Sequence, residues 1–323
     1  MNLLVTGASG FVGQHLCRAL TKRGHRVTAA VRASATPETA AVAQRVVVGD
    51  IGPDTDWSAA LVGQQAIFHL AARAHVMAET TADPEPLYHR VNVEGTANLL
   101  AQAKSAGVVR IIFLSSIKVN GEQTTTHPFT EAMAAAPQDA YGRTKRDAEL
   151  LLERDPELVA TIIRAPLVYG PGVKGNFLKL LGLCDRGWPL PIGRIANQRS
   201  LIYLDNLVDA LILSLEHAKS AGQTFLVSDG EDVSTPELFE RTAVALGKPS
   251  RLLPVPLSVL RLAGLLTGKS ATIDRLCGSL QIDNRHICQQ LGWKPPVSLQ
   301  QGLDKTVNWY QKHSQPEGSQ GAS

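Results

Sequence analysis

The sequence predicts an α/β fold: a doubly wound parallel sheet with helices on both faces, interleaved with a smaller C-terminal unit. Two observations lead to this prediction. Short apolar, β-branched runs alternate in the first half of the chain with segments whose apolar residues recur at helical spacing. The first run ends in a glycine-rich turn that opens directly into a helical pattern. The 323 residues, 44% apolar and 19% charged, suffice for a large packed core.

The first half of the chain predicts six strands connected mainly by helices. Strands are expected at residues 2–6, 26–31, 45–49, 66–71, 110–115 and 160–163, and helices at 13–23, 88–106 and 141–154. Right-handed crossovers between parallel strands place such helices on both faces of the sheet.

The second half is expected to be less regular. Pro and Gly residues interrupt the chain from 166 to 193, which predicts loops and short segments there. Strand patterns return at 200–204 and 224–227, and a helix is expected at 235–246, with Thr235 as its cap and Pro236 at its first position. The predicted division is a first domain over 1–165 with return segments near 200–230, a second mainly over 166–310, and a disordered tail at 311–323.

Composition excludes several classes of partner and site. The net charge of +3 is spread without basic blocks, so nucleic acid is not expected as a partner. The four cysteines lack the spacing of a disulfide framework or a metal site. The N-terminus lacks the features of a signal peptide, and the longest apolar stretch, 257–266, is shorter than the ~18 residues that span a membrane. That stretch is expected to be a buried helix, and the protein to be cytoplasmic.

The glycine-rich turn predicts a dinucleotide site in the first domain. Glycines at intervals of three allow a tight turn, close approach to a pyrophosphate and packing of the helix on the sheet, while the helix N-terminus supplies free N–H groups. The cofactor-binding residues expected here are Gly7, Gly10, Phe11, Val12 and Gly13.

The end of the second predicted strand bears on which dinucleotide binds. An NAD site usually places an acid there, but residues 28–37 contain none, and Arg32 could pair with a 2′-phosphate. NADP is therefore favoured over NAD, with a solvated role for Arg32 as the alternative. Asp50 and Ile51 follow the third strand and are expected beside the adenine.

A tyrosine and a lysine four residues apart are the candidate chemical groups. Tyr141 and Lys145 fall on one helix face, and a nearby cation lowers the pKa of a phenol, which would let Tyr141 relay a proton. Upstream, the fifth strand ends in Ser115 and Ser116, at the sheet edge where ligands bind in such folds.

Together these motifs resemble the extended short-chain dehydrogenase/reductase superfamily, and within it the NAD-dependent epimerase/dehydratase family that acts on nucleotide-sugars. The resemblance covers about residues 1–310, and it implies a Rossmann fold whose first domain binds NAD(P) and whose second binds a UDP-sugar. The motifs are the turn at 6–13, Gly49 to Ile51, His69 to Ala72, Val91 to Thr96, Ser115-Ser116, Tyr141 to Lys145, and Arg164 to Gly172.

The resemblance also assigns roles. Ser116 is the expected catalytic hydroxyl, Tyr141 the acid/base, and Lys145 the residue that tunes Tyr141 and holds the nicotinamide ribose. Leu70, Ala71 and Ala72 are expected at the cofactor, and Asn176 and Arg199, with Arg275 as a further candidate, at the substrate diphosphate. A homodimer formed through two helices is expected. Neither His69 nor His75 has metal-ligand spacing, and both are expected to be packing or hydrogen-bonding residues.

The run from Ser115 to Glu122 favours a C4-ketone reductase as the main interpretation, although 4-epimerases have closely similar sequences. It resembles the subgroup that includes reductases of the C4 ketone of UDP-2-acetamido-2,6-dideoxy-4-hexulose, which form UDP-N-acetylquinovosamine for surface polysaccharide. Lys118, two residues past Ser116, would then reach the sugar or a phosphate, or else be a surface lysine. The alternative is a UDP-glucose or UDP-N-acetylglucosamine 4-epimerase with bound NAD, and a remote one is a non-catalytic dinucleotide-sensing regulator.

Overall fold

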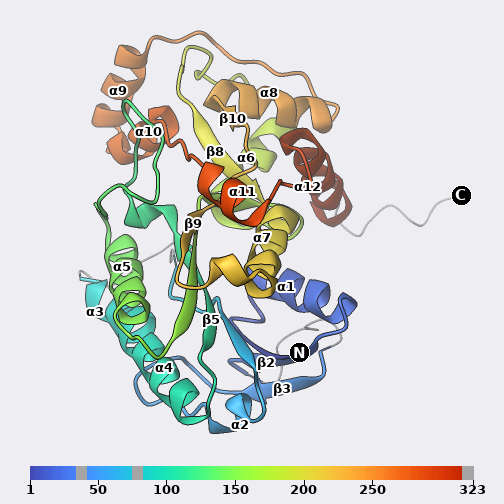
Figure 1. The fold of residues 1–323 in the computed structure, drawn as a ribbon. Coiled ribbons are helices and arrows are strands. Elements are labelled where there is room, and N and C mark those ends of the chain that lie inside the picture. The colour runs from blue at the N-terminus through green and yellow to red at the C-terminus, as the bar shows by residue number, and fades with distance from the viewer. Residues whose placement is uncertain (34–41, 75–82, 315–323) are drawn as a thin grey trace, which may run out of the picture.

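The computed structural model describes residues 1–33, 42–74 and 83–314. Within these residues, seven strands form a parallel sheet in the order β3-β2-β1-β4-β5-β6-β9, and three more form a second sheet in the order β10-β8-β7. The first order is that of a doubly wound sheet with one added strand, so the predicted fold class is confirmed. The large sheet fills the lower half of Figure 1 and the smaller part lies above it.

The large sheet and its helices come from both halves of the chain. Its strands are β1 (Asn2–Thr6), β2 (Arg26–Val31), β3 (Gln44–Val47), β4 (Ala66–His69), β5 (Arg110–Ser116), β6 (Val159–Ala165) and β9 (Thr224–Leu226). Its helices are α1 (Phe11–Lys22), α2 (Ser58–Leu61), α3 (Glu85–His89), α4 (Gly95–Ser105), α5 (Ala140–Glu153), α7 (Leu204–Glu216) and α11 (Arg285–Leu291).

Alternate side chains of the buried strands supply two separate cores. Leu3 and Val5 of β1 pack with residues of α1, α7 and α11, whereas Leu4 between them packs with residues of α2, α4 and α5. This alternation follows from the two-residue repeat of a strand, and it explains why the sheet needs a helical layer on each face.

The smaller part has its own sheet and core. It contains β7 (Leu167–Tyr169), β8 (Arg199–Tyr203), β10 (Asp232–Val233), α6 (Gly175–Arg186), α8 (Thr235–Ala245), α9 (Leu257–Leu266), α10 (Ser270–Cys277) and α12 (Leu299–Ser314). Its core is built on Tyr169, Phe177 and Tyr203. The Tyr169 ring lies 5.2 Å from that of Phe177 and 5.5 Å from that of Tyr203.

Three local predictions for the second half are wrong. Helix α6 fills part of the stretch expected to be loops, because the twelve residues from Gly175 to Arg186 contain no Pro and bury an apolar face. The cap of α8 is Ser234, whose Oγ accepts the Glu237 amide, so the expected cap Thr235 is the first helical residue. Helix α12 runs to Ser314, four residues into the predicted tail; 315–323 lie outside the described residues.

The apolar stretch 257–266 forms helix α9, but the expectation that it is buried is wrong. Leu262, Leu265 and Leu266 are 57%, 70% and 79% exposed. Only one side of the helix packs, through Leu260 and through Gly264 against Ile273. Apolar residues occur on nearly every side of α9, so its sequence gives little periodic signal of which side is covered. No helix within the described residues is both long and apolar enough to cross a bilayer.

Candidate active site

The glycine-rich turn lies at the carboxyl end of β1. Gly7 has a φ of +67°, and its carbonyl accepts the Gly10 amide at 2.9 Å before α1 begins at Phe11. A Cβ on Gly13 would lie 2.1 Å from the Gly7 oxygen, so only glycine lets the helix approach the turn this closely. The first N–H groups of α1 therefore face a turn without side-chain bulk, as a pyrophosphate site requires.

The end of β4 lies against this turn. Thr6 and His69 are register partners, and the Thr6 hydroxyl lies 2.7 Å from His69 Nδ1 and accepts the Ala71 amide at 3.2 Å. A Cβ on Gly7 would lie 2.8 Å from the Ala71 nitrogen, which places residues 70–72 beside the turn. The two segments that the sequence identified, residues 6–13 and 70–72, therefore lie side by side at the carboxyl ends of β1 and β4.

His69 is a structural residue. Its Nε2 lies 2.9 Å from the Thr96 hydroxyl, so the imidazole connects β1, β4 and α4. Burial, with the neighbouring Lys145 charge, lowers the pKa of His69 to about 3, so the ring is neutral at physiological pH. His75 lies outside the described residues.

Arg32 and Asp50 meet at the ends of neighbouring strands. The Arg32 guanidinium and the Asp50 carboxylate form an ion pair at 2.9 Å, with both side chains largely exposed. Ile51 packs against the start of α4, where a Cβ on Gly95 would lie 2.7 Å from its Cγ2. A group that approaches Arg32 therefore also meets the negative charge of Asp50.

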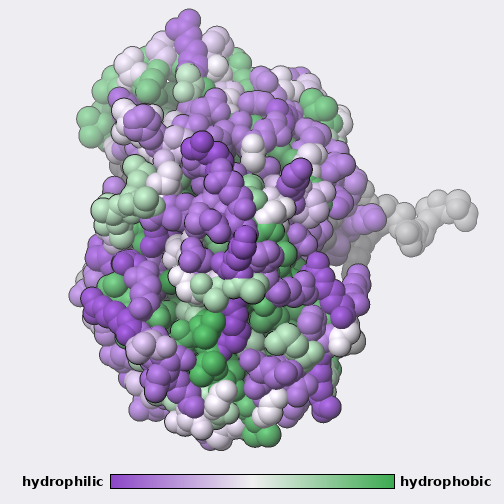
Figure 2. All heavy atoms as spheres, in the orientation of Figure 1, coloured by the Kyte–Doolittle hydropathy of each residue, from purple (hydrophilic) through white to green (hydrophobic). Residues whose placement is uncertain are grey.

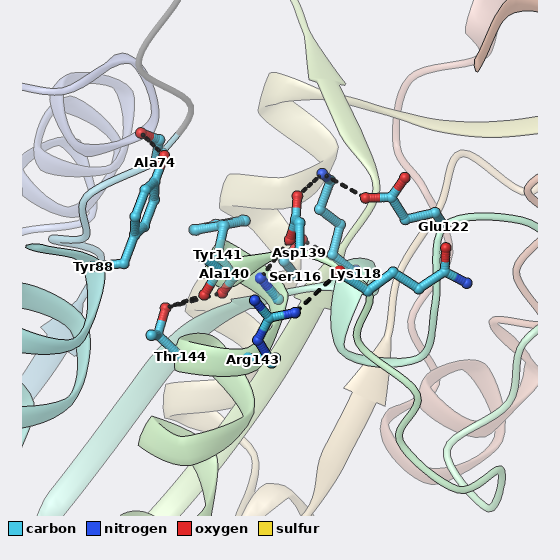
Figure 3. A network of polar contacts seen from close by, with 12 residues as sticks. Ala74, Tyr88, Ser116, Lys118, Glu122, Asp139, Ala140, Tyr141, Arg143 and Thr144 are labelled. Carbon is cyan, nitrogen blue, oxygen red and sulfur yellow. Dashed lines mark hydrogen bonds and ion pairs between the residues drawn. The ribbon is translucent and has the colours of Figure 1, made fainter. Parts of the chain in front are cut away.

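Ser116 and Tyr141 are neighbours in the folded chain. Ser116 ends β5, Tyr141 lies in the first turn of α5, and the Ser116 side chain is near enough to lower the pKa of the Tyr141 phenol. Asp139 caps α5, its Oδ1 accepting the Gly142 amide at 2.7 Å, and this cap fixes Tyr141 over the sheet edge (Figure 3). The serine and tyrosine identified in the sequence thus lie together at one site.

The pKa of Tyr141 in the protein alone is raised, not lowered as expected. Burial, followed by the charge of Asp139, raises it to about 12, against a smaller lowering by the Ser116 side chain. Lys145 is buried one turn further along α5, with its Nζ 3.8 Å from the centre of the Phe113 ring. Burial lowers the pKa of Lys145 to about 7. The cost of removing both side chains from water outweighs the attraction between a Tyr141 phenolate and the Lys145 ammonium, which the four-residue spacing predicted.

Lys118 belongs to a charge cluster of the protein itself. Its ammonium forms ion pairs with Asp139 and, at 3.2 Å, with Glu122 (Figure 3). Asp139 lies 21 residues from Lys118 and next to Tyr141 in the folded chain, so the sequence did not reveal this contact. Lys118 therefore lies beside the Ser116–Tyr141 pair, bound to two carboxylates.

Asn92 and Tyr88 are site residues that our sequence reasoning missed. Asn92 is buried in a π-helical turn, Arg90–Glu94, between α3 and α4. Its Oδ1 accepts the Arg73 amide at 2.8 Å, and its Nδ2 donates to Thr144 Oγ1 at 3.1 Å, which connects the segment after β4 to α5. The Tyr88 ring meets that of Tyr141 edge to face at 6.4 Å. The motif from Val91 to Thr96 was a usable signal, because π-helical turns are frequent at functional sites.

A buried ion pair supports the helix that carries Tyr141 and Lys145. Glu149, one turn after Lys145, accepts Arg164 Nη2 at 2.6 Å, Arg164 Nε at 2.9 Å and the Ser115 hydroxyl at 2.5 Å. Glu149 is fully buried and Arg164 nearly so. The pair therefore joins α5 to β5 and β6 directly beneath the site.

The predicted diphosphate residues lie in the smaller part of the molecule. Asn176 is exposed in the first turn of α6. Arg199 begins β8, and its Nη1 donates to the carbonyl oxygens of Arg275 at 2.6 Å and Gly278 at 3.2 Å. The structure thus brings Arg199 to the end of α10, where Arg275 itself is exposed. Their contacts with a substrate remain predictions.

Comparisons with known proteins agree with this geometry. The model of the "NAD dependent epimerase/dehydratase family" matches residues 3–228. The UDP-glucose 4-epimerase of Vibrio cholerae is 46% identical over 312 residues, which cover 95% of this chain and 94% of that protein.

Two solved structures extend the likeness over nearly the whole chain. The crystal structure of UDP-glucose 4-epimerase with UDP-glucose from Thermotoga maritima is 26% identical, has a TM-score of 0.77, and covers 98% of this chain and 100% of that one. The structure of MoeE5 in complex with UDP-glucose and NAD is 26% identical, has a TM-score of 0.76, and covers the same shares.

Proposed function

Because this chain belongs to the NAD-dependent epimerase/dehydratase family, we propose that it is a UDP-sugar 4-epimerase that works with a bound NAD. The observation that carries the proposal is the 46% identity to a UDP-glucose 4-epimerase along almost the full length of both chains. The neighbouring Ser116 and Tyr141, with Lys145 one helical turn away, supply the groups for proton transfer at a sugar hydroxyl.

The side chains of the site have distinct tasks in this reaction. Residues 7–13 and 70–72 would hold NAD, which would supply a reversible hydride acceptor at the sugar carbon. Tyr141 Oη takes the proton of the sugar hydroxyl and gives it back, and the Ser116 hydroxyl holds the same oxygen in place. Since the pKa of Tyr141 is about 12 in the protein alone, loss of its proton requires positive charge nearby. Lys145, on the same helix face and with a pKa of about 7, supplies that charge when it is protonated.

Residues 7–13 and 70–72 fit the dinucleotide that this reaction needs. The turn is held in a shape that a Cβ on Gly7 or Gly13 would disrupt, and it leaves the N-terminus of α1 open to a pyrophosphate. The structure of MoeE5 contains NAD in a chain of the same fold. NAD is therefore the cofactor we assign here, and a preference for NADP remains a prediction from Arg32.

The 4-keto reductase is the second candidate, and the run from Ser116 to Gly121 is the observation that favours it. The identity to an epimerase favours the first candidate over it. A role in surface polysaccharide synthesis, a cytoplasmic location and a homodimer formed through two helices also remain predictions.

One experiment separates the two reactions. The purified protein is incubated with UDP-glucose or UDP-N-acetylglucosamine without added cofactor, and in parallel with UDP-2-acetamido-2,6-dideoxy-4-hexulose and NADPH. We expect each UDP-sugar to interconvert with its C4 epimer over many turnovers at constant nicotinamide absorbance, because an epimerase regenerates its cofactor. Consumption of NADPH one for one with the keto sugar, without epimerisation, would instead establish the reductase.

The Arg32–Asp50 pair predicts how the choice of cofactor can be altered. The Asp50→Asn variant removes the negative charge beside Arg32 and frees its guanidinium, so we expect NADP⁺ affinity to rise by roughly tenfold relative to NAD⁺. Asp54→Asn is the matched control, because Asp54 is equally exposed and pairs with Arg90 instead. Titration of both cofactors measures the ratio of NADP⁺ affinity to NAD⁺ affinity. An unchanged ratio in Asp50→Asn would exclude Arg32 as the residue that binds the 2′-phosphate.

A further inference from the structure

Helix α9 presents an apolar face to solvent. Val259, Leu262 and Leu266 recur at intervals of three and four, so they share one side of the helix, and Leu265 lies beside them. Leu253, in the preceding loop, is also exposed. Figure 2 shows hydrophobic side chains gathered at the upper left, where α9 lies, with hydrophilic ones around them.

The opposite side of α9 is firmly packed. Leu260 is buried, and Gly264 lies so close to α10 that a Cβ on it would be 2.8 Å from Ile273. Rotation of the helix to bury its leucines would break this contact. The exposed face is therefore a fixed feature of the fold, and its side chains are available to something outside the chain.

The charge around this helix is strongly positive. Residues 248–277 contain five Lys and Arg against one Asp, a net charge of +4, whereas the whole chain carries +3. Arg251, Arg261, Lys269 and Arg275 are all exposed, and the described part of the chain offers none of the four an ion-pair partner. Arg251 lies in the loop before α9 and Arg261 in α9 itself. Lys269 lies in the turn after α9, and Arg275 in α10.

We propose that α9 and these four basic residues bind the surface of a membrane that contains anionic lipid. The helix has ten residues, a length of about 15 Å, so it can lie in the headgroup region but cannot cross the ~30 Å hydrocarbon core. Exposed leucines flanked by unpaired cations are the combination that drives such binding. Cations distributed over several elements match a diffuse negative surface better than the localised acids of a protein groove.

The proposed surface adjoins the predicted diphosphate residue. Helix α10, which supports α9, ends where the carbonyl oxygens of Arg275 and Gly278 accept the Arg199 guanidinium. Attachment through α9 would therefore hold this end of the smaller part close to the lipid. The inference rests on exposure and charge, and it is independent of the proposed epimerase reaction.

Flotation of the full-length protein with vesicles tests the proposal. The vesicles are phosphatidylcholine alone, or phosphatidylcholine mixed with phosphatidylglycerol. We expect the protein to float with the anionic vesicles at low salt, to be released as salt screens the charges, and not to float with phosphatidylcholine alone. No flotation with the anionic vesicles would overturn the proposal.

Two pairs of variants locate the contact. The double variant Leu262→Gln with Leu266→Gln should weaken binding about tenfold or more, whereas Val244→Gln, an equally exposed apolar position on α8, should not. Arg261→Gln with Lys269→Gln should weaken binding roughly fivefold per residue. Lys22→Gln with Lys219→Gln, which alters two exposed lysines away from α9, is the control and should leave binding unchanged. All these side chains are exposed, so the variants should keep the wild-type melting temperature.

Two further outcomes would overturn the proposal. Equal binding by the wild type and the α9 variants would place the membrane contact elsewhere. If the leucine variants changed only the oligomeric state, measured by sedimentation, the α9 face would be a contact between protein chains.

Discussion

Replacing Tyr141 by phenylalanine is expected to lower turnover by ~10²–10⁴ while cofactor binding persists. The ring and its packing against Tyr88 remain, and only the hydroxyl that is proposed to exchange a proton is lost. Turnover is followed by chromatography of the UDP-sugars, and cofactor binding by titration. If Tyr141 transfers the proton as proposed, the defect should appear in kcat and not in the dissociation constant of NAD.

Tyr88→Phe is the matched control for this prediction. It removes a phenolic hydroxyl from a ring at the same site, but that hydroxyl is directed to the Ala74 carbonyl 3.5 Å away. We expect it to retain most of the wild-type turnover. If Tyr141→Phe kept more than about a tenth of that turnover, Tyr141 would not be the acid/base and another donor would have to be sought.

Replacing Glu149 by glutamine should lower the free energy of unfolding by ~3–5 kcal/mol, because it leaves Arg164 as a buried, uncompensated charge. The amide also turns a hydrogen-bond donor toward groups that now donate to the carboxylate. Urea denaturation followed by circular dichroism measures the loss.

Glu153→Gln is the control for the buried pair. Glu153 accepts a hydrogen bond from the same Arg146 that contacts Glu149, but it is partly exposed, so its replacement should change stability by no more than ~0.5 kcal/mol. Equal effects of the two substitutions would show that the buried pair contributes no more than a surface pair does.

The elements that sequence predicted well are those with local signals. Strand β1 occupies the predicted residues 2–6, and α5 begins within one residue of the predicted start at Tyr141. A run of β-branched residues, a glycine that needs positive φ and an acid that caps a helix each act through neighbours in the chain, and the sequence displays all of them.

What the sequence did not predict depends on contacts between distant residues. Lys118 meets Asp139 and Arg32 meets Asp50 only after folding, and the high pKa of Tyr141 follows from burial that no spacing shows. Helix α9 was misjudged for the same reason, since the number of neighbours that cover a helix is decided by the rest of the fold.

The path of the chain through the two parts of the molecule affects how it can be divided. After β6 it enters the smaller part at β7, returns with α7 and β9, leaves again at β10, returns with α11 and ends in α12. No single cut therefore yields a fragment with a complete core, and the halves could not be expressed as autonomous pieces. Separate folding of one half before the other is likewise disfavoured, so a nascent chain must reach α11 before the large sheet is covered.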